Sequence, residues 1–364
     1  MQRNEPGAPP RPDERTAPWA RSGLPPPRYD HLIRMTSRHG VWEHAKYDEV
    51  RTEHGLCTDD NARALIVVSR PHSPTRTLIN LAARYLMFLL DARTPEGGFH
   101  NRRHADGSWL DDVGSDDSQG RALWALGFIA RHGPQRWMRR AGLDAFKASD
   151  GFTSVHLRAN AFAVLGGVEV LAMDPQDAQT RALVGRAVEP IVEAVQQRFP
   201  WPEKRLTYDN ARLPTALLAA GTALHDPKLL SLGTRLLTWL VGVETRGDRF
   251  SFTGTDGWAP GEDRPVFDQQ PVEAAAMVEA CHRAWKVTGE QTWRVHTVNA
   301  ARWFHGFNDT GCVVYDDRSG GSRDGLMADG VNENLGAEST LAGLAALQVA
   351  ASCAVDVPGA GQAS

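Results

Sequence analysis

The chain has few cysteines and no long apolar run. Its cysteines, Cys57, Cys281, Cys312 and Cys353, lie far apart and form no CxxC pair. We therefore expect free thiols in a reducing, cytoplasmic environment and no disulfide framework. No apolar stretch reaches the roughly 18 residues of a membrane-spanning helix without a charge or a glycine. We expect no membrane partner.

Strong net charge and cofactor motifs are missing as well. The formal net charge is −4, which is too small to favour nucleic acid as a partner. There is no HExxH, no zinc-type cysteine and histidine cluster and no EF-hand calcium loop. No glycine-rich phosphate loop follows a strand pattern, so the usual nucleotide-sugar site of a transferase is not expected. We predict no cofactor and no required metal.

What the sequence does contain is one motif repeated along the chain. Residues 54–70 read HGLCTDDNARALIVVSR, a polar cluster followed by an apolar run, which predicts the start of a buried helix. Residues 115–130 repeat the acidic pair and Arg-Ala-Leu, and residues 208–224 repeat Asp-Asn-Ala-Arg. The same pattern recurs in three further stretches, the last of them weaker: 267–285, 336–350 and 154–171.

These repeats predict the fold. Helices rich in Ala, Gly and Leu on all sides are buried, whereas stretches such as 77–91 and 181–199 have the apolar spacing of amphipathic helices. Alternation of the two kinds about six times predicts an all-α (α/α)6 toroid of helical hairpins. We assign residues 29–353 to this domain, with a disordered Pro- and Arg-rich arm at 1–28 and a flexible tail at 354–364. The arm lacks the apolar segment of a signal peptide.

Acidic side chains at the helix starts are candidate catalytic groups. Glycoside hydrolysis uses one carboxyl group as acid and a second as base or nucleophile, and crowded carboxylates raise one another's pKa. Our candidates for this pair are Asp60 and Asp117, and the sequence does not say which is the acid. Aligning Arg-Ala-Leu pairs Asp59 with Asp117, whereas aligning Asp-Asn-Ala-Arg pairs Asp60 with Asp209. Alternatively, the aspartates only cap their helices.

Other polar and aromatic side chains at these helix starts, or in the loops before them, are candidate substrate ligands. Carboxylates and amides bind sugar hydroxyls, and arginines bind an anionic sugar or neutralise the crowded acids. Tryptophans in exposed loops stack on sugar faces. The candidates are Asp59, Asp116, Arg63, Arg121, Trp109, His156, Asn160, Asp209, Trp258, Asp268, Gln269, Gln270 and Glu338.

Four stretches carry a resemblance to a known family: CTDDNARAL, GSDDSQGRALWALG, FDQQPVEAAAMVEAC and NENLGAESTLAGLAAL. Together they resemble a bacterial domain found alone or behind the catalytic domain of proteins described as glycosyltransferases, over about residues 29–351. The resemblance implies a six-hairpin, glycosidase-like (α/α)6 fold. It also implies carbohydrate chemistry, an oligosaccharide or polysaccharide substrate and a functional link to a glycosyltransferase.

Three alternatives to a hydrolase stay open. A polysaccharide lyase needs a base and a group that neutralises a uronate carboxyl, for which the chain offers Tyr208, His156, Arg158, Asn160, Arg102 and Arg103. A sugar epimerase uses histidine as acid and base, and the candidates are His44, His54, His156 and His282. A non-catalytic module that assists a transferase would need only aromatic side chains around a polar mouth, such as Trp42, Trp109 and Trp258.

Overall fold

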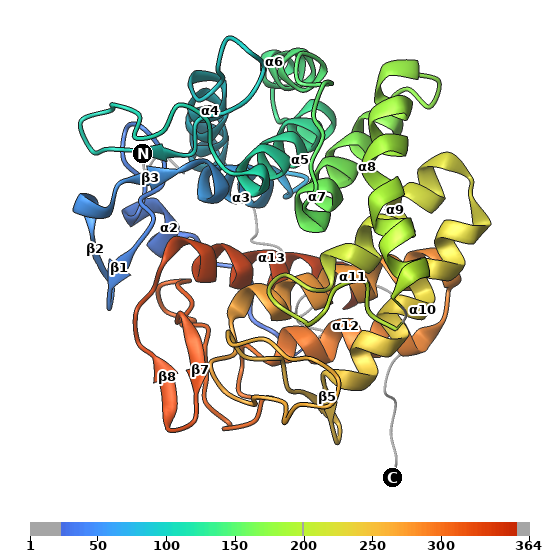
Figure 1. Ribbon diagram of the computed structural model, residues 1–364. Coiled ribbons are helices and arrows are strands. Elements are labelled where there is room, and N and C mark those ends of the chain that lie inside the picture. Colours follow the sequence, from blue (N-terminus) through green and yellow to red (C-terminus); the bar gives the residue numbers. More distant parts are fainter. Residues whose placement is uncertain (1–22, 199, 355–364) are drawn as a thin grey trace, which may run out of the picture.

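The computed structural model describes residues 23–198 and 200–354 (Figure 1). Within these residues, six inner helices form a closed ring, because each packs against the next and the last packs against the first. In chain order they are α3 (Thr58–Ser69), α5 (Asp116–His132), α7 (Leu157–Leu171), α9 (Arg212–Leu224), α11 (Pro271–Thr288) and α13 (Ala337–Ala354). The weak sixth copy of the motif is α7, a complete member of the ring.

A second layer of helices surrounds the ring. Five of them pack against the inner helix that precedes each in the chain: α4 (Arg76–Asp91), α6 (Arg136–Lys147), α8 (Ala178–Gln197), α10 (Pro227–Val243) and α12 (Gln291–Arg302). Helix α13 packs against α12 and against the short α2 (Asp30–Arg34), which comes from the other end of the sequence. This architecture is the predicted all-α (α/α)6 toroid.

Burial explains why the two layers differ in sequence. Along α7, nearly every side chain from Arg158 to Leu171 is buried, so the helix has no room for a polar face. On α4, the buried residues recur at helical spacing and include Leu78, Leu81, Tyr85 and Leu89. Side-chain caps also fix the starts of several outer helices: Thr75 caps α4, Asp177 caps α8 and Asp226 caps α10.

Two inner helices, α9 and α11, begin a few residues after the polar cluster of the repeated motif. Asp209 lies three positions before the first residue of α9, and Asp268 lies three positions before the first residue of α11. Both have left-handed φ values, 48° and 60° respectively. By contrast, Asp59 and Asp117 are each the second residue of their helices, α3 and α5. The Arg-Ala-Leu alignment therefore matches residues at equivalent positions in their helices. The two Asp-Asn-Ala-Arg segments, by contrast, lie at different positions relative to the helix start.

Short two-stranded antiparallel sheets lie in the segments that connect the helices. Those in the described residues pair β1 (Ala45–Lys46) with β2 (Glu49–Val50), β3 (Leu56–Cys57) with β4 (Arg102–Arg103), β5 (Thr245–Arg246) with β6 (Arg249–Phe250), and β7 (Gly325–Met327) with β8 (Gly330–Asn332). β3 and β4 are not a hairpin, because α3 and α4 lie between them in the chain; their pairing joins the segments that lead into α3 and α5. The β7–β8 hairpin stands before α13.

The described residues begin within the predicted arm and end at the start of the predicted tail. Residues 1–22 and 355–364, which hold most of the predicted arm and tail, lie outside the described residues. Residues 23–28 already contact the toroid: Leu24 is buried, and the Arg28 N–H donates to the Tyr315 hydroxyl at 3.0 Å. None of the four cysteines forms a disulfide. None of the helices within 23–198 and 200–354 combines the length and apolarity needed to cross a bilayer.

Helices α5 and α7 approach each other so closely that glycine is required where they touch. A Cβ added at Gly127 would lie 2.1 Å from the Gly166 carbonyl oxygen, and one at Gly166 would lie 2.3 Å from the Leu123 carbonyl oxygen. Both neighbours are backbone atoms, which cannot rotate away. These glycines therefore set the distance between two of the six inner helices.

We predict that Gly127→Ala lowers the free energy of unfolding by about 1–3 kcal/mol, because the added methyl group forces two backbones apart. Gly185→Ala on α8 is the matched control, since its Cβ meets nothing within 4 Å. This control should be neutral or stabilising by about 0.4–1 kcal/mol. Urea unfolding of both variants measures the difference, and equal stabilities would contradict the packing described here.

Candidate functional site

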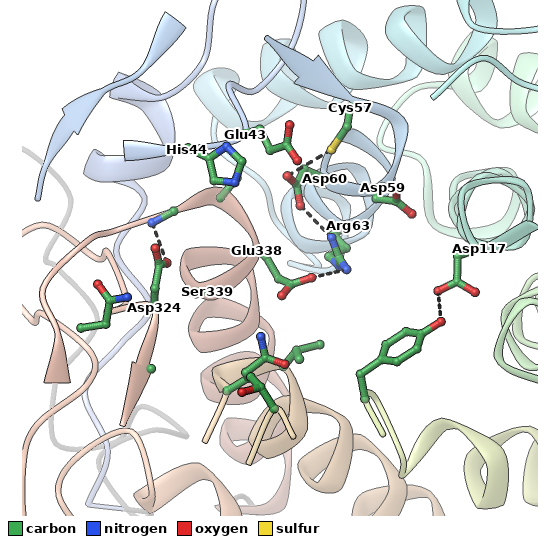
Figure 2. Close-up of a pocket in the computed structure, with 18 of the residues that line it drawn as sticks. Glu43, His44, Cys57, Asp59, Asp60, Arg63, Asp117, Asp324, Glu338 and Ser339 are labelled. Carbon is green, nitrogen blue, oxygen red and sulfur yellow. Dashed lines mark hydrogen bonds and ion pairs between the residues drawn. The ribbon is translucent and has the colours of Figure 1, made fainter. Parts of the chain in front are cut away.

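A cavity of about 800 Å³ opens at the end of the ring where α3, α5 and α13 begin (Figure 2). The first turns of these helices supply part of its wall. The rest comes from the segments before α9 and α11, from Glu43 and His44 just before β1, and from the β7–β8 hairpin. Most of these segments are loops that lead into an inner helix, which is where the repeated polar clusters of the sequence lie.

The wall is strongly acidic. Among the described residues that line it, seven carry carboxylates and two carry guanidinium groups, Arg63 and Arg121. The carboxylates are those of Glu43, Asp59, Asp60, Asp117, Asp268, Asp324 and Glu338. No group of three or more potential metal ligands forms a metal-binding cluster in the described part of the chain. Such a wall favours a ligand rich in hydroxyl groups over an anionic one.

Asp60 is the most deeply buried of these acids, at 3% exposure. Its Oδ1 accepts from Arg63 Nη1 at 2.7 Å, and its Oδ2 accepts from the Cys57 thiol at 3.2 Å. Burial raises the pKa of Asp60 to about 6, although the Arg63 charge opposes this rise. Asp60 thus exchanges its proton near neutral pH, which is the property required of a general acid.

Arg63 connects α3 to α13. Besides Asp60, it contacts Glu338 on α13, with Nη2 2.5 Å from Oε2. Burial alone would lower the pKa of Arg63, but the Glu338 and Asp60 charges outweigh burial and raise it. The guanidinium group is therefore permanently charged, and it holds two carboxylates of the wall in fixed positions.

Asp117 belongs to the other side of the cavity, where Figure 2 shows it apart from the Asp60, Arg63 and Glu338 group. The Tyr208 hydroxyl donates to its Oδ2 at 2.5 Å. Burial and the Asp117 charge raise the pKa of Tyr208 well above its usual value. The phenol therefore keeps its proton and supplies a charge-assisted hydrogen bond that positions the Asp117 carboxylate.

Asp59 lies between these two groups and is paired with Arg121. The Arg121 Nε lies 3.5 Å from Asp59 Oδ1, and its Nη2 lies 3.0 Å from Asp209 Oδ2. Within the described residues, Asp59 Oδ1 is buried without a hydrogen bond. This oxygen is out of reach of solvent, and its partner is the Arg121 charge.

The structure brings one group of the predicted site residues together and separates the rest. Those in the cavity wall are Asp59, Asp60, Arg63, Asp117, Arg121, Asp268, Gln270 and Glu338. Those outside the wall are Asp116, Trp109, His156, Asn160, Asp209, Trp258 and Gln269. We therefore withdraw this second group as direct substrate ligands.

The polar members of the second group have protein partners instead. Asp209 is fully buried between Arg121 and Arg212. The fully buried Gln269 accepts from the Phe252 N–H and from Trp303 Nε1. Two others, Asp116 and Asn160, bond to the hydroxyl and the carbonyl oxygen of Ser154, and His156 is exposed beside them. Their side chains stabilise the loops behind the wall.

The tryptophans predicted to stack on sugars stack on the protein. Trp109 lies against His100, with ring centroids 5.0 Å apart, and the Arg103 guanidinium lies 4.7 Å from its ring. Trp258 stacks on Trp239, and its Nε1 donates to the Glu262 carbonyl oxygen. Loop composition indicated exposure, but packing of the loops half-buries both indoles.

Sequence reasoning missed several members of the wall, including Glu43, Asp324, Asn332 and Ser339. Asp324 and Asn332 belong to the segment that leads into α13. The Glu43 carbonyl oxygen accepts from the Ala337 N–H at 3.1 Å. This contact spans most of the sequence, so no local pattern could have predicted it.

Comparison with known proteins adds information about the fold. No family model and no curated protein matches the chain. A cellobiose 2-epimerase from Bacillus thermoamylovorans is similar in structure, with a TM-score of 0.70 and 12% identity over 89% of this chain and 96% of that one. The chain therefore shares the overall fold of that structure.

The GH76 alpha-mannanase BT2949 of Bacteroides thetaiotaomicron is another similar structure, with a TM-score of 0.64 and 12% identity over 93% of this chain and 96% of that one. A third is an inactive alpha-1,6-mannanase of Salegentibacter, in which two adjacent aspartates are replaced by asparagine, in complex with alpha-1,6-mannotriose. Its TM-score is 0.59, with 10% identity over 92% and 97% of the two chains. At these identities the likeness shows the fold of this toroid alone.

Replacing Arg63 with methionine should lower the free energy of unfolding by about 3 kcal/mol, because Asp60 would be buried without its cation. The loss should be larger at pH 8 than at pH 5. Without Arg63 the folded-state pKa of Asp60 rises further, and an acid with a raised pKa destabilises the fold as pH rises.

Urea unfolding at both pH values measures the effect. Arg140→Met removes an exposed pair with Asp144 and serves as the control, because exposed pairs contribute little. If both variants lost the same stability, independent of pH, Arg63 would not be holding Asp60 as described.

Proposed function

We propose that this toroid is a glycoside hydrolase that cleaves neutral oligosaccharide or polysaccharide chains in the acidic cavity. The observation that carries the proposal is that the cavity holds two carboxyl groups in contrasting environments. Asp60 is buried with a pKa raised to about 6, whereas Asp117 lies across the cavity and accepts a hydrogen bond from Tyr208. A glycosidase needs this division into a proton donor and an ionised partner.

Asp60 is the general acid in this proposal. Its proton passes to the glycosidic oxygen as the bond to the leaving sugar breaks, and Arg63 at 2.7 Å stabilises the carboxylate that remains. Asp117 is the base or nucleophile on the other side of the sugar. The Tyr208 hydroxyl orients it and donates no proton in the reaction, since its pKa is too high.

The similar mannanase supports a role for the neighbouring aspartate as well. That enzyme is inactive when two adjacent aspartates are replaced. In this chain both members of the pair Asp59 and Asp60 line the cavity, whereas only Asp117 of the pair Asp116 and Asp117 does. Asp59 is therefore our second candidate for the base, held at the cavity wall by its ion pair with Arg121.

The contacts of the competing residues disfavour a lyase. Of its predicted cationic groups, Arg102 forms two hydrogen bonds to Glu43 and Arg103 pairs with Asp91. The Arg158 guanidinium is bonded to Glu203 and Asn210. The acidic wall would repel the uronate polymer that a lyase cleaves.

An epimerase is the second candidate function, because a cellobiose 2-epimerase shares the fold. Of the described histidines, His44 alone lines the cavity, so a pair of histidines acting as acid and base is not supported. Among the others, His282 bonds to Ser352 instead. A glycan-binding module that assists a glycosyltransferase, and a cytoplasmic location, stay predictions from the sequence.

We predict that Asp60→Asn and Asp117→Asn each lower kcat by about 10²–10⁴-fold, the usual effect of removing a general acid or base. Asp116→Asn is the matched control, because that carboxylate contacts Ser154 outside the wall, and its activity should change little. Asp59→Asn decides between the two candidate bases. If Asp60→Asn kept full activity, the proposed acid would be wrong.

The pKa of Asp60 also predicts a pH profile. The acid must carry its proton, so kcat/KM should fall as pH rises through about 6. In Arg63→Met this alkaline limb should move to higher pH, because the cation that holds down the pKa of Asp60 is gone. Initial rates from pH 4 to pH 9 measure both profiles. A wild-type kcat/KM that stayed constant from pH 5 to pH 8 would contradict the assignment.

A further inference from the structure

A second cavity of about 510 Å³ lies beside the first, between the β1–β2 hairpin and the segment that follows β8. The two cavities meet at Asn332, which lines both. They also meet at a histidine pair: His54 lines the second cavity, and its Nδ1 lies 3.1 Å from Nδ1 of His44, which lines the first. The two cavities are therefore adjacent.

Tyr47 projects at the tip of the β1–β2 hairpin. It is 60% exposed and takes a φ of 53°, a conformation that favours glycine or asparagine. Its backbone is nevertheless fixed, because its N–H donates to Asn334 Oδ1 at 3.0 Å and its carbonyl oxygen accepts from the Leu335 N–H at 2.9 Å. A large aromatic side chain held exposed by a strained, fully bonded backbone indicates a function for the ring.

The chemistry of this cavity suits a sugar. The Tyr47 ring offers a flat apolar face, while Lys46 and the amides of Asn332 and Asn334 offer hydrogen-bond groups to hydroxyls. The cavity lacks the acid crowding of the first, since Glu333 is its single described carboxylate. It thus has binding groups without the catalytic pair.

We propose that this second cavity is a distal subsite, in which Tyr47 stacks on a sugar unit of a glycan whose scissile bond lies in the first cavity. The proposal rests on the hydrolase function proposed above. It makes the enzyme selective for chains longer than a disaccharide, because a disaccharide in the first cavity does not reach Tyr47.

The test is binding as a function of chain length. Isothermal titration is done with the full chain carrying Asp60→Asn, so that the ligand stays intact. The probes are α-1,6-linked mannooligosaccharides and β-1,4-linked cellooligosaccharides, from disaccharide to hexasaccharide. Adding Tyr47→Gly should lower affinity for the longer chains of one series by about tenfold, the loss of one aromatic stacking contact. Affinity for the disaccharide should not change.

The choice of variant separates binding from folding. Glycine accepts a φ of 53° without strain, so Tyr47→Gly should leave the Tm unchanged or raise it. Tyr47→Trp, which restores an aromatic ring, should recover the affinity. Trp137→Ala removes an exposed indole on α6 that lines neither cavity and should change nothing.

Three results would overturn the subsite. The first is equal affinity for hexasaccharides in Asp60→Asn and in the double variant that also carries Tyr47→Gly. The second is an equal loss of affinity for oligosaccharides of every length, and the third is an affinity of Asp60→Asn that does not rise with chain length in either series. Hydrolysis of disaccharides by the wild type, together with any of these, would reject the subsite and keep the hydrolase. Length-dependent binding through Tyr47 without turnover would keep the subsite and reject the hydrolase.

Discussion

The interior of the toroid depends on a chain of alternating arginines and carboxylates along its axis. Arg70 and Arg212 share Glu279, Arg212 also contacts Asp209, and Asp209 contacts Arg121. Arg70 directly follows α3, Asp209 precedes α9, and the other groups lie on α5, α9 and α11. The ion pairs therefore connect helices that are distant in sequence. Buried pairs of this kind are costly to break, because each loss leaves an uncompensated charge.

The same ion pairs prepare the mouth of the ring for chemistry. Arg121 forms ion pairs with both Asp209 and Asp59. Arg63 forms ion pairs with both Asp60 and Glu338. Arginine is always charged, so the carboxylates that it contacts stay fixed over a wide pH range. Asp60 differs because the effect of burial on its pKa is larger than the opposing effect of the Arg63 charge. Its pKa therefore rises to about 6. The network that stabilises the fold thus leaves Asp60 able to carry a proton.

Local patterns predicted the parts of the structure that depend on local interactions. Buried helices have few polar residues, and helix starts have polar clusters, so the ring and the positions of Asp59, Asp60 and Asp117 followed from the sequence. Trp109, Trp258 and Gln269 were misplaced because packing between distant loops, not composition, decides which side chains reach a cavity. Glu43 reaches the wall through its backbone bond with Ala337, a pairing that leaves no local trace.

Hydrolysis of a glycosidic bond is the central claim, and the origin of the product oxygen tests it most directly. The wild-type protein is incubated with a panel of α- and β-linked oligosaccharides in water enriched in oxygen-18, and the products are weighed by mass spectrometry. The account predicts that each cleavage adds one water to the products and that the added oxygen is labelled. Fragments lighter by one water would identify a lyase, and an altered sugar of unchanged mass would identify an epimerase.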